Sequence, residues 1–189
     1  MSEYPSQLES FREYLLKYNC RTNLVSRKMT PAQLETIIAE SLMVAEKIES
    51  DTVIDAGSGN GLLGIPIALR YPQKKIVLVE AQQKKVRFLH SLLACLTMPN
   101  VTVASISLQE YMHHQKTDEM ALVARGFPQN EALVHYLLRR RLRELLLITS
   151  NEKAKKLAPL IEKCREKHYN IPSRTNLIIL KLENVSRET

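Results

Sequence analysis

Residues 53–66 constrain the fold more than any other stretch, because they combine an apolar strand, a glycine-rich turn and the start of a helix. The apolar run ends at an acid, Asp55, and glycine then occupies three alternate positions, Gly57, Gly59 and Gly61. Glycine adopts positive φ and lets a ligand approach the backbone, and a helix start presents unpaired N–H groups. The stretch therefore predicts a nucleotide-type cofactor site at the end of the first strand of a doubly wound α/β sheet.

The spacing of the glycines indicates which cofactor the turn binds. A dinucleotide-binding turn follows G-x-G-x-x-G, but the sixth position counted from Gly57 is Leu62. The acid-x-G-x-G-x-G pattern resembles the first motif of class I S-adenosylmethionine methyltransferases. A second acid is expected about 20 residues further on, at the end of the next strand, to hold the ribose hydroxyls. Glu80 fills this position after the apolar run 75–79; an ordinary loop acid is the alternative interpretation.

Length and composition restrict the class of protein. A chain of 189 residues with 44% hydrophobic and 25% charged residues suits one globular domain, with a helical cap over 1–50 and an α/β core over 51–189. There is no apolar run of about 20 residues and no N-terminal signal pattern, so we expect a cytoplasmic monomer that does not bind membranes. Three scattered cysteines indicate neither a disulfide framework nor a metal site. A net charge of +7 suits a polyanionic partner such as nucleic acid.

Hydrophobic periodicity predicts an alternation of strands and helices behind two N-terminal helices. The predicted helices cover 6–18, 31–49, 62–70, 82–97, 107–113, 128–142 and 151–168. The predicted strands cover 52–55, 75–80, 101–104, 120–124, 144–149 and 176–182. We therefore expect a class I S-adenosylmethionine methyltransferase fold of the α/β class, which is Rossmann-like, with a mostly parallel sheet and an antiparallel last strand.

Four motifs, in order along the chain, resemble those of the RsmG or GidB family, which methylates guanine N7 in 16S ribosomal RNA of the small subunit. Residues 18–25 are similar to W-N-x-x-x-N-L-T, and residues 55–66 to D-x-G-S-G-x-G-x-P-G-I-P. Residues 84–89 are similar to K-R-V-x-F-L, and residues 124–126 to S/A-R-A. The resemblance covers residues 11–150 well and the remainder loosely.

The resemblance implies a site for S-adenosyl-L-methionine. Asp55, Gly59 and Gly61 belong to its turn, Gly57 and Leu62 would contact the methionine and ribose side, and Glu80 would hold the ribose. Leu108 and Gln109 stand where the family contacts the adenine, and Arg125 occupies the position of a cofactor-contacting arginine. Guanine N7 has a free lone pair and no proton to lose, so no general base is expected and catalysis is a matter of positioning. Arg125 and Asn23 are expected to take part in that positioning.

Two groups of cations are candidates for binding ribosomal RNA or the small ribosomal subunit through phosphate contacts. They are Lys84, Lys85 and Arg87 in one helix, and Arg140 and Arg143 in a cluster at the end of another. Solvated helix faces, or cations that favour a helix C-terminus, are the alternative interpretations.

The chain departs from the family in two segments. The family's Arg-His-x-x-Asp-Ser corresponds to T-I-I-A-E-S at 36–41, and its A-L-K-G to I-T-S-N at 148–151. Two other functions therefore stay open. One is a divergent methyltransferase acting on another RNA or a small acceptor, and the other is a non-catalytic relative that binds cofactor or RNA.

Overall fold

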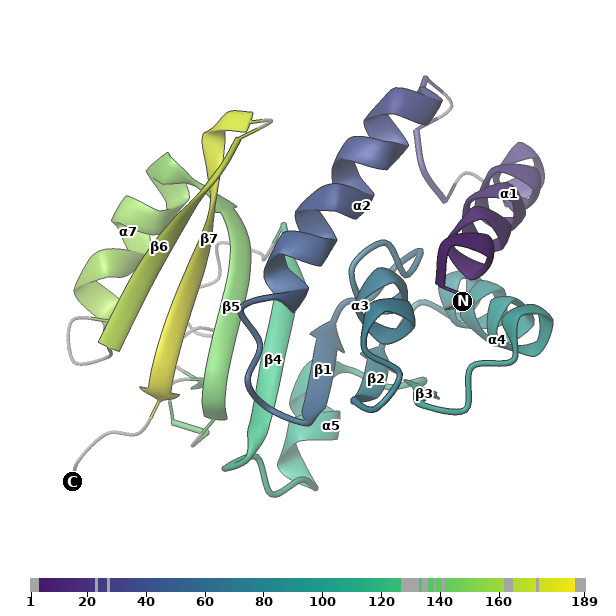
Figure 1. The fold of residues 1–189 in the computed structure, drawn as a ribbon. Helices are drawn as coiled ribbons and strands as arrows, with labels where there is room; N and C mark the ends of the chain where they lie inside the picture. The colour runs from purple at the N-terminus through teal and green to yellow at the C-terminus, as the bar shows by residue number, and fades with distance from the viewer. Residues whose placement is uncertain are drawn as a thin grey trace.

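A central β-sheet organises the protein. The computed structural model describes residues 4–22, 24–26, 28–126, 133, 136–137, 139–140, 142–161, 165–172 and 174–185. Within this part of the chain the sheet has seven strands in the order β3-β2-β1-β4-β5-β7-β6 (Figure 1). The strands are β1 (Thr52–Ala56), β2 (Lys75–Val79), β3 (Val101–Ala104), β4 (Met120–Arg125), β5 (Leu142–Ser150), β6 (Arg165–Ile171) and β7 (Arg174–Val185). The first five are parallel, and β7 is antiparallel to both β5 and β6, so the predicted antiparallel last strand is confirmed.

Helices cover both faces of this sheet, as the alternation in the sequence predicts. One face carries α1 (Tyr4–Thr22), α2 (Pro31–Ala45), α3 (Gly64–Arg70) and α4 (Gln83–Leu96), and the other carries α5 (Leu108–His113) and α7 (Asn151–Ile161). Successive strand residues point to opposite faces. Val53 accordingly packs in the cluster with the first group of helices, and the next residue, Ile54, packs with the second.

The two N-terminal helices form where the sequence places their signals. The Thr30 side chain accepts a hydrogen bond from the Gln33 N–H (3.2 Å), and the Gln33 side chain accepts one from the Thr30 N–H (2.9 Å). Pro31 follows as the first helical residue, where its missing N–H costs nothing. In α1, Phe11 and Leu15 are fully buried, and α1 packs against α4 and α3. The cap therefore lies on the face of the sheet that α3 and α4 cover (Figure 1).

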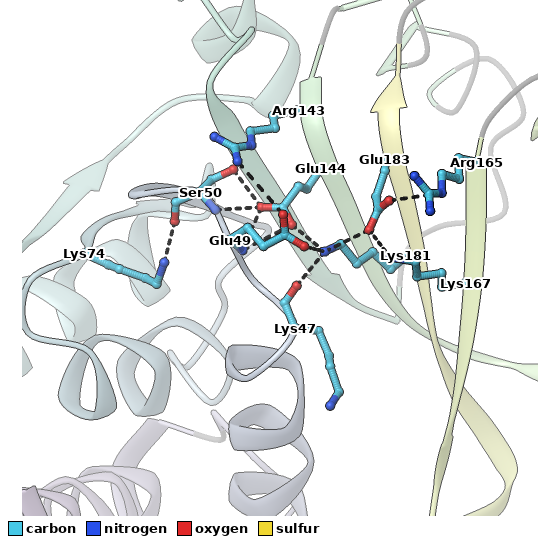
Figure 2. Close-up of polar contacts among 10 residues, drawn as sticks. All are labelled: Lys47, Glu49, Ser50, Lys74, Arg143, Glu144, Arg165, Lys167, Lys181 and Glu183. Carbon is cyan, nitrogen blue, oxygen red and sulfur yellow. Dashed lines mark hydrogen bonds and ion pairs between the residues drawn. The ribbon is translucent and has the colours of Figure 1, made fainter.

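A buried ionic cluster fastens the connection after α2 to the sheet (Figure 2). Lys181 of β7 is only 2% exposed, and its Nζ lies 2.8 Å from carboxylate oxygens of Glu144 and Glu49 and 2.9 Å from the Lys47 carbonyl oxygen. Glu144 of β5 also accepts hydrogen bonds from the Ser50 N–H and hydroxyl at 2.8 and 2.7 Å. Burial alone would raise the pKa of Glu144, but hydrogen bonds from Lys181 and Ser50 outweigh it and hold that pKa below its usual range.

The structure corrects the sequence-based prediction near the C-terminus. The helix predicted over 151–168 is wrong in its second half, because α7 ends at Ile161 and residues 165–171 form strand β6. Helix α2 ends at Ala45 instead of residue 49. Most of the helix predicted over 128–142 lies outside the described residues, and Leu142 already belongs to β5. In the part of the chain that the structure describes, no helix combines the length and apolar character needed to cross a membrane.

Candidate cofactor site

The glycine turn lies at the carboxyl edge of the parallel strands, between β1 and α3. Gly57 and Gly59 have φ values of +70° and +60°, which only glycine adopts without strain. The N–H groups of Gly57 and Ser58 both donate to the Val79 carbonyl oxygen at the end of β2, at 2.9 and 3.0 Å. The Ser58 hydroxyl donates back to the Asp55 carbonyl oxygen at 2.9 Å. The turn is therefore fixed against β1 and β2.

Asp55 connects the end of β1 to the start of α3. Its Oδ2 accepts a hydrogen bond from the Gly64 N–H at 3.0 Å. A Cβ atom at Gly64 would lie 2.4 Å from Cδ2 of Leu78 and 2.8 Å from Oδ2 of Asp55, so only glycine allows the helix to come this close to the strands. The Asp55 carboxyl is 2% exposed, and its burial raises its pKa to about 7 despite the Gly64 and Ser58 hydrogen bonds. The group therefore changes its charge near neutral pH.

Glu80 holds the outer part of the turn. It follows β2 and is 6% exposed. Its Oε2 accepts the Gly59 N–H at 2.9 Å, and its Oε1 accepts the Gln82 N–H at 2.8 Å. A carboxylate oxygen can accept more than one hydrogen bond, so both oxygens keep the capacity to bind a ligand hydroxyl. The contact to a ribose stays a prediction, and the contact to the turn is a second role that the sequence did not reveal.

Arg125 ends β4 and is anchored by helix α2. Its Nη1 donates to the buried Glu40 carboxylate at 2.5 Å, and its Nη2 donates to the Ser41 hydroxyl and the Ile37 carbonyl oxygen, both at 3.1 Å. Glu40 also accepts a hydrogen bond from Nε of Arg174, at 3.0 Å. The Nε atom of Arg125 itself is buried and has no hydrogen-bond partner among the described residues. One N–H of this guanidinium is therefore unpaired within the described residues.

These elements enclose a pocket of about 170 Å³. The residues that line it are Leu24, Asp55, Gly57, Ser58, Gly59, Asn60, Leu62, Leu63, Lys85 and Arg125. Five of the residues predicted to bind the cofactor thus come together in one place, namely Asp55, Gly57, Gly59, Leu62 and Arg125. The pocket combines an acid of raised pKa with two cations, Lys85 and Arg125.

Gly61, Leu108 and Gln109, which were also predicted to bind the cofactor, are not among the residues that line this pocket. Gly61 has a φ of +75° and supports the turn from within, since a Cβ there would lie 2.8 Å from Cγ1 of Ile65. Leu108 and Gln109 begin α5, which follows β3. Leu108 packs against the second core cluster, and the Gln109 carbonyl oxygen accepts a hydrogen bond from the Tyr136 hydroxyl at 3.0 Å. Their contact to an adenine stays a prediction, and Asn23 lies outside the described residues.

The cations predicted to bind RNA do not share one surface. Lys84 and Arg87 are exposed near the start of α4, on the side of the cofactor pocket, and Lys85 lines that pocket. Arg140 instead donates to the Met112 carbonyl oxygen. Arg143 lies at the start of β5, with Nη2 4.0 Å from the Glu49 carboxylate. Since β5 runs parallel to β1 and β4, its start belongs to the edge of the sheet opposite the pocket.

Sequence reasoning missed the residues of α2 that hold Arg125. Glu40 and Ser41 are almost completely buried within a helix whose other buried residues are apolar. A buried acid on an apolar helix face requires a cationic partner. An acid on an apolar helix face can be recognised in the sequence, but the sequence does not show which cation pairs with it.

The strand order, the glycine turn and the pocket at the carboxyl edge define a class I S-adenosylmethionine-dependent methyltransferase fold, and known structures agree. An O-methyltransferase from Bacillus cereus, solved in complex with SAH, has a TM-score of 0.65 at 16% identity, covering 92% of this chain and 90% of that one. An rRNA methylase from Streptococcus thermophilus has a TM-score of 0.55 at 15% identity, covering 84% and 99%. The chain belongs to the GidB family, described as rRNA small subunit methyltransferase G, whose family model matches residues 5–179. The predicted fold class and family are thus confirmed.

Curated relatives share this family name. The ribosomal RNA small subunit methyltransferase G of Vibrio vulnificus is 32% identical over 130 residues, which is 69% of this chain and 61% of that protein. The ribosomal RNA small subunit methyltransferase G 3 of Bdellovibrio bacteriovorus is 36% identical over 111 residues, which is 56% of this chain and 50% of that protein. The chain thus spans between one half and two thirds of the length of these relatives.

Proposed function

We propose that this protein transfers the methyl group of S-adenosyl-L-methionine to a guanine N7 in small-subunit ribosomal RNA. The observation that carries the proposal is the pocket at the carboxyl edge of β1 and β4, in which the glycine turn, Asp55 and Arg125 meet in a chain of this family. The location that follows from this function is the cytoplasm, with the ribosome.

The residues present fit the cofactor. A Cβ atom at Gly57 would meet nothing within 4 Å, so the backbone of the turn is open to a ligand on that side. The buried, unpartnered Nε of Arg125 suits the carboxylate of the cofactor's methionine, since a buried donor without a partner is costly. Glu80, which accepts the Gly59 N–H of the turn, would also accept hydrogen bonds from the ribose hydroxyls. When bound, the cofactor supplies an electrophilic methyl group.

The contribution of the chain to the reaction would be orientation. Guanine N7 attacks through a lone pair and loses no proton, so no side chain has to act as a base. Holding donor and acceptor in line lowers the barrier by removing the entropy of their encounter. Arg125 suits such a role because three hydrogen bonds, to Glu40, Ser41 and the Ile37 carbonyl oxygen, fix its guanidinium. A fixed side chain positions its ligand better than a mobile one.

Two measurements on the full chain test this function. Calorimetry should show binding of S-adenosylmethionine and SAH with a dissociation constant of micromolar order, about −8 kcal/mol, and no competition by NAD. Small ribosomal subunits that lack guanine-N7 methylation should then accept tritiated methyl groups, and mass spectrometry of the RNA should place them on guanine.

The outcomes separate the proposed function from its alternatives. Cofactor binding without transfer to any RNA would identify a non-catalytic relative. Transfer to a different acceptor would identify a divergent methyltransferase. Binding of NAD in place of both methyl-cycle ligands would refute the assignment altogether.

A further inference from the structure

A second pocket, of about 480 Å³, lies beside Ile37 of α2, whose carbonyl oxygen accepts a hydrogen bond from Arg125. It lies where the connection between α1 and α2, the first half of α2 and the start of β7 meet. Its lining includes two cations, two polar residues and two apolar ones: Lys28, Arg174, Gln33, Thr36, Met29 and Ile37. The volume falls within the range of about 300–1,000 Å³ found for small-molecule sites.

Three links connect this second pocket to the cofactor pocket. The buried Glu40 carboxylate bridges Arg125, which lines the cofactor pocket, and Arg174, which lines the second pocket. Arg125 also donates to the carbonyl oxygen of Ile37, another lining residue of the second pocket. In addition, the segment after α1 borders both pockets, because Leu24 lines the first and Ser26 the second. The two pockets are therefore neighbours across Glu40 and Ile37.

The chemistry of the second pocket suits a nucleotide. Lys28 is exposed and Arg174 is 40% exposed, so both can reach a phosphate. Met29 and Ile37 are half-buried apolar side chains against which a base can pack, and the side chains of Gln33 and Thr36 offer polar atoms beside them. Single-stranded RNA is recognised by this combination of phosphate contacts, packing on the base and polar contacts to its edges.

Comparison with a third pocket supports a nucleotide as the ligand of the second pocket. A pocket of about 540 Å³ at the opposite edge of the sheet is lined by three acids, Asp51, Asp118 and Glu119, beside the cations Lys116 and Arg143. Those acids would repel a phosphate. The second pocket has the cations Lys28 and Arg174 and no acid among its lining residues in the described part of the chain.

We infer that the pocket formed by Lys28, Thr36 and Arg174 binds the acceptor nucleotide of the RNA, with Lys28 and Arg174 on its phosphates. This inference rests on the proposed function. Thr36 and Ile37 of α2 line this pocket at the two positions where the family motif has Arg and His. In this chain, Arg174 of β7 supplies a cation to the same pocket.

The experiment uses a fluorescein-labelled single-stranded RNA containing guanosine, titrated into the full chain with saturating SAH at several salt concentrations. Two variants alter the pocket: Lys28→Glu removes a cation, and Thr36→Phe fills the space. Lys116→Glu is the matched control, since Lys116 is also an exposed lysine that lines a pocket, but at the opposite edge. Circular dichroism and SAH titration confirm that each variant folds and still binds the cofactor.

We expect Lys28→Glu to reduce the slope of log K against log salt by at least about 0.7, the value for one phosphate contact to a single strand. Thr36→Phe should weaken RNA binding at least about tenfold with an unchanged slope, and Lys116→Glu should match the wild type. SAH affinity should stay within about twofold in all three.

Wild-type behaviour of both pocket variants would overturn the inference, and so would a wild-type chain that does not bind the RNA. Failure of the proposed function is distinct, because it would appear as loss of SAH binding or of methyl transfer by the wild type itself.

Discussion

Replacing Glu80 by glutamine should weaken cofactor binding through two separable effects. The Glu80 carboxylate accepts the Gly59 N–H at 2.9 Å and the Gln82 N–H at 2.8 Å. Glutamine has one acceptor oxygen, so its NH₂ group must face one of these N–H donors. A fully buried donor without a partner costs about 1–3 kcal/mol; since these two N–H groups are partly buried, the loss of stability in urea unfolding should lie at the low end of that range. Each lost hydrogen bond from a ribose hydroxyl to the charged carboxylate should cost a further 1.5–3 kcal/mol or about 10- to 150-fold in affinity.

A cycle of two proteins and two ligands separates the ribose contact from damage to the turn. Calorimetry would compare wild type and Glu80→Gln with SAH and with an SAH analogue that lacks both ribose hydroxyls. Damage to the turn weakens both ligands equally, whereas loss of the ribose contact weakens only SAH. Glu110→Gln is the control, because Glu110 is an exposed acid in the first turn of α5. Equal effects of Glu80→Gln on both ligands would show that Glu80 only holds the turn.

Three further perturbations follow from the charges described above. Lys181→Met leaves Glu144 buried without its cation and should lower the free energy of unfolding by about 3–5 kcal/mol at pH 7. Because the pKa of Glu144 is lowered in the fold, this difference between wild type and variant should shrink as acid protonates Glu144. A difference that does not change with pH would contradict the ion pair. The raised pKa of Asp55, about 7 against 3.8 when unperturbed, means that the folded state keeps a proton the unfolded state has lost, so stability should fall between about pH 4 and 7, by on the order of 4 kcal/mol. Asp55→Asn should remove this fall, and parallel urea-unfolding profiles for the two proteins would refute the assignment. Finally, replacing Lys84 and Arg87 by glutamate should flatten the salt dependence of RNA binding. Arg143→Glu, at the edge of the sheet opposite the cofactor pocket, should leave that dependence unchanged. The reverse result would place the RNA at the edge that contains Arg143.

The glycine turn and the first five strands could be predicted from the sequence because their signals are local. An apolar run that ends at Asp55, and alternate glycines after it, can adopt few conformations. The pairing of Glu40 with Arg174 could not be predicted, because the two residues are 134 positions apart and nothing local selects one arginine among many.

Strand β6 was mistaken for a helix because its sequence, Arg-Glu-Lys-His-Tyr-Asn-Ile, is polar and follows a helical segment. It forms a strand because β7 offers it a partner along nearly its whole length. That pairing depends on the tertiary fold, and the only hydrophobic alternation in the strand is the short one of Tyr169 and Ile171 at its end.

The same polar strand bears on how the protein avoids aggregation. In the described part of the chain, β6 is the outermost strand and pairs only with β7, so its other side presents a ladder of open backbone groups that could recruit a strand from another molecule. Arg165, Glu166 and His168 are exposed along it, and burying these charged and polar side chains would oppose such recruitment. The other outermost strand, β3, has only four residues and offers little backbone to pair. One edge of the sheet is thus protected by charge and the other by its short length.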